Sequence, residues 1–118
     1  MTFFYLASPY QNPDCPADVQ YCTQRFHEVC IAAAKLMVQG HRIFCPIAHS
    51  HPIADHLPPE TRSSHDFWLR QDFALLAMAD RLIVLQLYQW ERSYGVAQEI
   101  AFARDHGIPV TYLDPAAL

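Results

Sequence analysis

Apolar residues gather in four short runs along the chain, each bordered by proline, glycine, serine or aspartate. Continuous runs of this length are typical of strands that are buried on both faces of a parallel sheet. They predict strands at residues 2–7, 41–47, 81–87 and 109–113.

Between these runs the apolar side chains recur every three or four residues, which is the period of one helical face. This pattern predicts helices at residues 17–39, from 64 or 65 to 79, and at 94–106. Gly40 and Gly107 follow two of them at the position where a helix commonly ends in a left-handed residue. The polar, proline-rich stretch 48–64 predicts a long loop, and long loops in compact domains are often functional.

Strands alternate with helices from one end of the chain to the other, which is typical of a parallel α/β sheet. The length of 118 residues predicts a single domain over residues 1–118, and right-handed crossovers constrain the order of its strands. We expect it to be a flavodoxin- or Rossmann-like three-layer sandwich with about four strands in the order 2-1-3-4. Ligands of such sheets bind beyond the carboxyl ends of the strands, where the strand order reverses. That places segments 7–11, 48–64 and 88–99 around the expected site.

Composition excludes several classes of protein. Hydrophobic residues make up 52% and charged residues 17%, so the chain is not disordered. The net charge of −4 argues against a nucleic-acid binder. No run approaches the roughly 20 apolar residues of a membrane span, and no signal peptide is recognisable. We therefore expect a cytoplasmic protein, and the cysteines, which form no CxxC pair, are expected to be free thiols.

Two carboxylates stand out because they fall on inward faces of the predicted helices. Asp72 lies in the middle of the apolar stripe of its helix, and Glu99 lies between Phe102 and Ala103 on the inward half of the next one. A carboxylate in apolar surroundings costs free energy unless it is paired or protonated. Each acid alone could be an ordinary helix-end residue, but two inward acids near the strand ends fit the pair that glycosyl transfer or hydrolysis needs.

The start of the last helix offers two further candidates. Ser93 could cap that helix or donate a hydroxyl to a bound anion. Gly95 has no side chain and would let a ligand approach the backbone of the first turn. GxGxxG, GxxxxGK[ST] and GxSxG motifs are all absent from the chain.

The histidine-rich stretch allows three interpretations. Cys45, His49, His51, Asp55 and His56 could ligate a metal ion, but their spacing is no known zinc signature. The stretch could be a plain polar loop, or it could be a lid in which Ile47, His49 or His51 packs against a flat ligand. We expect no metal among the site residues.

Three segments together resemble the nucleoside 2-deoxyribosyltransferase superfamily, and within it a small bacterial branch of similar length. They are FFYLASPYQ with Tyr5, DFALLAMADRLIVL with Asp72 eight residues before Asp80, and GVAQEIAFA with Gly95 and Glu99. The resemblance covers most of the chain, and the order and spacing of the three segments agree together.

The resemblance implies a site, a reaction and a substrate class. Glu99 would attack the anomeric carbon of the sugar, Asp72 would handle the proton on the base, and Tyr5 would orient Glu99. Ser93 stands six residues before Glu99, as in similar 2′-deoxynucleoside 5′-monophosphate N-glycosidases, where such a serine helps to bind the phosphate. The loop with Ser8 and Pro9 would also contact the substrate.

The expected partner is a small nucleoside or nucleotide, and no cofactor is expected. If the two acids act together, we expect their carboxylates within roughly 5–8 Å of each other and Tyr5 within reach of Glu99. A non-catalytic nucleotide-binding or sensor module and a metal-dependent hydrolase remain the alternatives.

A homo-oligomer, most simply a dimer, is expected for two reasons. The chain carries more large aromatic residues than its few elements need, and surplus aromatic surface often marks an interface. They are Phe67, Trp68, Tyr88, Trp90, Tyr94, Phe102 and Tyr112. Members of the superfamily that the chain resembles also complete their pockets with residues from a neighbouring subunit.

Overall fold

The computed structural model, which describes residues 2–118, is a parallel α/β sandwich. Its four strands stand in the order β2-β1-β3-β4, and every pair is parallel. The strands are β1 Phe4–Ala7, β2 Ile43–Phe44, β3 Arg81–Leu85 and β4 Val110–Leu113. The predicted fold class and strand order are confirmed.

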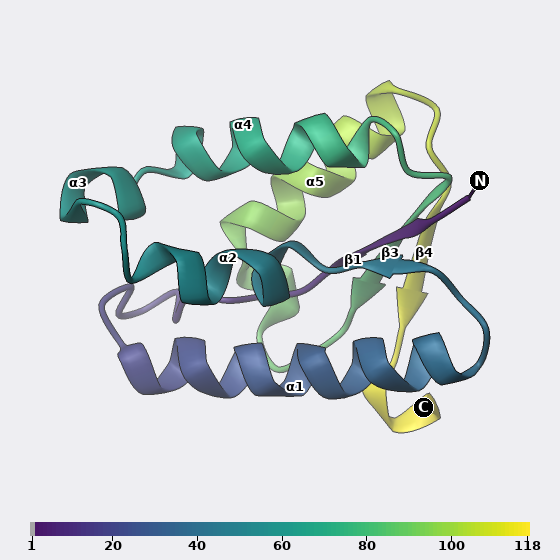
Figure 1. The fold of residues 1–118 in the computed structure, drawn as a ribbon, viewed down its shortest axis with the longest axis horizontal. Coiled ribbons are helices and arrows are strands. Elements are labelled where there is room, and N and C mark those ends of the chain that lie inside the picture. The colour runs from purple at the N-terminus through teal and green to yellow at the C-terminus, as the bar shows by residue number, and fades with distance from the viewer. Residues whose placement is uncertain (1) are drawn as a thin grey trace.

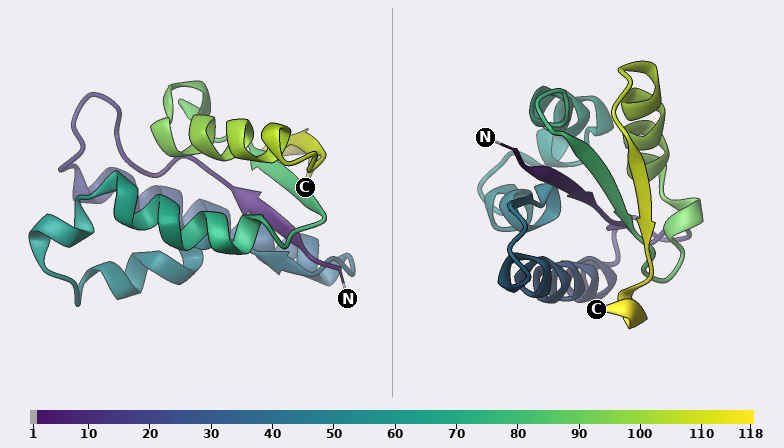
Figure 2. Two further views of the ribbon diagram at one scale, coloured as in Figure 1. Left: turned by 90° about the horizontal axis from the view of Figure 1, so that it is seen from above. Right: turned by 90° about the vertical axis from the view of Figure 1, so that its right-hand side faces the viewer.

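Helices cover both faces of this sheet (Figures 1 and 2). They are α1 Val19–Val38, α2 Pro46–Ala54, α3 Pro59–Arg62, α4 His65–Leu76 and α5 Tyr94–Asp105. Helix α1 lies on one face together with α2, and α4 and α5 lie side by side on the other. None of the helices in residues 2–118 is both long and apolar enough to cross a membrane.

Two cores fill the space between the layers. Alternation along β1 sends Leu6 toward α1 and sends Tyr5 and Ala7 toward α4 and α5. The first core includes Val29, Ala33, Leu36, Ile83 and Leu85, and the second includes Leu76, Leu82, Val84, Val96 and Ala103. Tyr5 therefore stands in the layer that also carries the two candidate acids.

The helix ends follow the sequence closely. Asp18 caps α1 by accepting a hydrogen bond from the Tyr21 amide at 3.1 Å. Gly40 and Gly107, after α1 and α5, have φ angles of 100° and 68°. Glycine adopts this left-handed region at little cost, so both helices stop where the sequence predicts.

The loop predicted at 48–64 is wrong, since this stretch contains α2 and α3. Pro46 and Pro59 each begin a helix, because proline has the φ of a first helical residue and needs no partner for an N–H. The same Pro46 shortens the strand predicted at 41–47 to Ile43–Phe44. In the printed sequence these prolines resemble loop markers, yet they start helices.

Candidate active site

Tyr5 and Glu99 form a buried pair between the sheet and α5. The Tyr5 hydroxyl donates a hydrogen bond to Glu99 Oε2. Tyr5 is fully buried and Glu99 is only 5% exposed. A residue of the central strand therefore holds one oxygen of the carboxyl group and leaves the other, Oε1, without a hydrogen bond from the described residues.

The helix places Glu99 there through ordinary packing. Val96, Glu99 and Ala103 are the buried residues of α5 and lie on one face, three and four residues apart. Ser93 caps this helix, and its Oγ accepts a hydrogen bond from the Val96 amide at 3.2 Å. An acid thus occupies a position of the helix that an apolar residue would normally fill.

Asp72 approaches the pair from the neighbouring helix. Helices α4 and α5 pack against each other, with the rings of Phe73 and Phe102 stacked at 4.4 Å between centroids. Asp72, next to Phe73, is half-buried. Its negative charge acts on both Glu99 and Tyr5, so the structure brings the three residues into one electrostatic unit.

Burial changes the protonation of all three groups. It raises the pKa of Asp72 to about 6. It also raises the pKa of Glu99 to about 8, with a further contribution from the Asp72 charge and an opposing one from the Tyr5 hydrogen bond. The pKa of Tyr5 is raised well above its usual value by burial and by the two acids, so its hydroxyl stays protonated. Near neutral pH the two acids hold one proton between them.

This arrangement lacks any cation that would make it a structural ion pair. The two ion pairs found in residues 2–118 are Arg25 with Glu28 and Arg92 with Asp14. Buried acids with raised pKa values and no countercharge are costly to stability and are common at catalytic sites. The site can supply a nucleophilic carboxylate together with a proton donor.

The expected substrate-binding residues near the strand ends have open or unsatisfied groups. Ser8 is 5% exposed, and its Oγ is the buried side-chain polar atom that lacks a partner within residues 2–118. Pro9 beside it is fully buried. A Cβ on Gly95 would meet nothing within 4 Å, so the backbone of the first turn of α5 faces open space.

The candidates from the histidine-rich stretch divide between the two faces of the sheet. Ile47 packs against the core under α1, opposite the acids. His51 stacks on Phe26 at 4.2 Å, and its Nδ1 lies 2.5 Å from the Tyr10 hydroxyl. Both Ile47 and His51 are thus engaged within the fold, and the structure does not bring them to the acids.

His49 stands closer to the acids, through Phe44, a residue that the sequence pattern did not single out. Its ring lies 6.0 Å from that of Phe44, which in turn lies 5.8 Å from the ring of Tyr5. Cys45 is buried, and burial raises the pKa of its thiol to about 12, with a contribution from Glu99. Phe44 ends β2 beside Tyr5 of β1, and Cys45 follows it as the N-cap residue of α2, so the strand order was the signal that could have identified Phe44.

The residues considered for metal binding do not converge. Within residues 2–118, no three His, Cys, Asp or Glu side chains gather in a way that could hold a metal ion. His49 and His51 lie within α2, whereas Asp55 and His56 follow its last residue, Ala54.

Comparison with known proteins adds a family but no activity. Residues 2–114 match the family described as domain of unknown function (DUF1937). The chain belongs to this family. The match spans every strand and all five α-helices, including the three residues of the candidate site. No curated protein matches the chain.

Proposed function

We propose that the chain cleaves or transfers the N-glycosidic bond of a deoxynucleoside or a deoxynucleotide, with Glu99 as nucleophile. The observation that carries the proposal is the buried Glu99 carboxyl group, held by Tyr5 and close to the charge of Asp72. The resemblance of three sequence segments to nucleoside 2-deoxyribosyltransferases supports the same roles. The four free cysteines fit a reducing compartment, which supports a location in the cytoplasm.

The reaction would proceed in two steps. A Glu99 oxygen attacks the anomeric carbon while the bond from that carbon to the base breaks. The bonding electrons go to the base, which takes a proton from Asp72, and a glycosyl ester remains on Glu99. Asp72 then removes a proton from water or from a second base as that acceptor attacks the ester. Tyr5 acts throughout as a neutral hydrogen-bond donor that holds Glu99.

The first turn of α5 and the residues after β1 would bind the sugar side of the substrate. The unpartnered Ser8 hydroxyl could be satisfied by a substrate hydroxyl or phosphate oxygen. The open backbone at Gly95 leaves room for either group at the positive end of the helix. Both nucleosides and 5′-monophosphates are therefore included among the substrates.

A screen of the purified protein tests this proposal. Each of the common 2′-deoxynucleosides and its 5′-monophosphate is incubated with the protein, with and without a second free base. Released or exchanged base is then measured by chromatography. We expect at least one substrate to give free base or a new nucleoside. Saturable binding without any release or exchange would instead support a non-catalytic nucleotide-binding module.

A plot of kcat/KM against pH should be bell-shaped, and the pKa values of the two acids should set its two sides. The productive form needs Glu99 as carboxylate and Asp72 protonated, which is one arrangement of the singly protonated pair. That pair predominates between the pKa of about 6 at Asp72 and the pKa of about 8 at Glu99. We expect kcat/KM to fall below the lower value and above the upper one. A profile that is flat from pH 5 to pH 9 would contradict a shared proton.

We also propose that the active unit is a homo-oligomer, most simply a dimer. Tyr88 is 71% exposed and Tyr94 is 50% exposed, and they flank the connection that leads into α5. Light scattering at micromolar concentration should give at least twice the 13.5 kDa of one chain. Phe102 supports this less than expected, because it is stacked between Phe73 and His106 within the fold. A monomer with full activity would contradict the proposal.

A further inference from the structure

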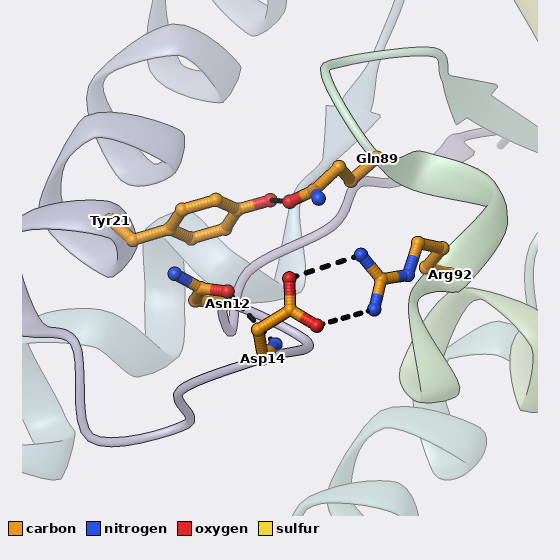
Figure 3. A network of polar contacts seen from close by, with 5 residues as sticks. All are labelled: Asn12, Asp14, Tyr21, Gln89 and Arg92. Atoms are coloured by element: carbon orange, nitrogen blue, oxygen red, sulfur yellow. Dashed lines mark hydrogen bonds and ion pairs between the residues drawn. The ribbon is translucent and has the colours of Figure 1, made fainter.

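Two polar contacts join the segments that follow β1 and β3, the neighbouring strands where the sheet order reverses (Figure 3). Arg92 donates two hydrogen bonds to the Asp14 carboxylate, at 2.6 and 3.2 Å. The Tyr21 hydroxyl donates to Gln89 Oε1 at 3.0 Å and lies 3.3 Å from the Tyr88 carbonyl oxygen. We call Asp14, Tyr21, Gln89 and Arg92 the clasp.

One side of the clasp is firmly anchored. Asn12 accepts a hydrogen bond from the Asp14 amide at 2.9 Å and donates one to Asp18 at 3.1 Å. Asp18 in turn caps α1, the helix that carries Tyr21. Asp14 and Tyr21 are therefore fixed to the start of a 20-residue helix.

The other side of the clasp is held in an unusual backbone conformation. Gln89 has a φ of 64° and a ψ of 24°, the left-handed region that residues other than glycine seldom adopt. Such a conformation persists where surrounding contacts impose it, and it is enriched at functional sites. Gln89 is a member of the clasp, and so is Arg92, one residue before the cap of α5.

We propose that the clasp positions the helix of the nucleophile. The 86–93 connection passes from β3 through Gln89 and Arg92 directly into Ser93, Gly95 and Glu99. A contact that fixes this connection against α1 therefore fixes the first turns of α5 against the carboxyl end of β1, where Ser8 lies. Tyr21 and Arg92 are positioning residues, and their role in the reaction rests on the proposed function.

The exposure of the Arg92–Asp14 ion pair indicates that the clasp serves to position α5 rather than to stabilise the whole fold. Arg92 and Asp14 are 51% and 67% exposed at the side chain, and exposed ion pairs contribute little to folding. Small displacements of a reacting group, by contrast, can cost up to about 100-fold in rate. Loss of the clasp should thus affect turnover more than folding.

The test combines Tyr21→Phe with Arg92→Met, which keeps the aromatic ring and the length of the side chains. We expect kcat to fall about tenfold, with a smaller change in KM, at a temperature where the variant is fully folded. Exchanging the charges, with Asp14→Arg and Arg92→Asp together, should restore much of the rate that Arg92→Met alone removes. The control is Tyr112→Phe with Arg104→Met, because the Arg104 guanidinium and the Tyr112 hydroxyl form an exposed contact at 3.1 Å that includes no clasp residue, and phenylalanine keeps the ring that packs against Trp90.

Hydrogen exchange gives a readout that does not depend on activity. In the Tyr21→Phe, Arg92→Met variant, the amides of Val96 and Ala97, which bond to Ser93, should exchange several-fold faster, while those of β4 keep their rates. Unchanged exchange in the first turn of α5 overturns the positioning role, whether or not base release is found. If exchange is faster in the variant but the wild-type protein releases no base, the positioning of α5 is supported and the proposed function alone is overturned. Unchanged kcat in an active enzyme also overturns the role.

Discussion

Replacing Glu99 by Gln is expected to lower the rate of base release by on the order of 1000-fold or more, because an amide cannot form the glycosyl ester. Glutamine has the same length, and its carbonyl oxygen can accept the hydrogen bond that the Tyr5 hydroxyl donates to Glu99. The variant should therefore fold and keep the shape of the site. Steady-state release of free base from the best substrate of the screen measures the loss.

Two further measurements make this result specific to the nucleophile. Glu60→Gln makes the same chemical change on an exposed residue of α3 and should leave the rate unchanged. Acid quenching during turnover, followed by mass spectrometry of peptides, should find a deoxyribosyl group on the peptide that contains Glu99. A Glu99→Gln variant that keeps more than about a tenth of the rate would exclude Glu99 as nucleophile.

The sheet could be predicted because its strands bury both faces. Such strands are continuous apolar runs, and RLIVL in β3 is buried from Leu82 to Leu85. Right-handed crossovers then leave few possible orders, and 2-1-3-4 is the one observed. Helices α2 and α3 escaped prediction because they are short, with 9 and 4 residues, and contain too few turns for a periodic pattern.

The two acids could be located for the same physical reason that makes them candidates. Asp72 and Glu99 each interrupt an apolar stripe, and a helical wheel registers that interruption without knowledge of the fold. The contacts of Phe44, Cys45 and the clasp depend on which strands are neighbours and on how loops cross the sheet edge. Asp14 and Arg92 are 78 residues apart in the chain, and no local pattern joins them.

Histidines in the 46–54 helix show the limit of reading residue types alone. The spacing suggested that His49 and His51 could act together. In a helix, however, side chains two positions apart point about 200° away from each other. His51 consequently faces Phe26 and Tyr10, while His49 faces Phe44. The secondary structure of the stretch, rather than its composition, decides which histidine lies toward the site.

Burial of Glu99 should also make the protein less stable as the pH rises, and Glu99→Gln should remove that dependence. The pKa of Glu99 is raised from 4.5 to about 8 in the fold. Between these values the native state binds more protons than the unfolded state, so stability falls with increasing pH and levels off above the upper value. Glutamine at this position carries no charge at any pH and avoids the loss.

Each unit of pKa corresponds to about 1.4 kcal/mol, so the stabilisation by Glu99→Gln at pH 9 should amount to a few kcal/mol, or on the order of 10–20 °C in Tm. At pH 4.5 the difference should be small, because Glu99 is protonated in the native state there. Thermal unfolding followed by circular dichroism at both pH values measures it. Asp72, with a pKa of about 6, adds its own pH dependence to both proteins at lower pH. If Tm depends on pH in the same way in the wild type and the variant, the pKa of Glu99 is not raised in the native state.

The variant that should abolish turnover should thus be the more stable protein, as expected if the buried charge is retained for chemistry at a cost to folding.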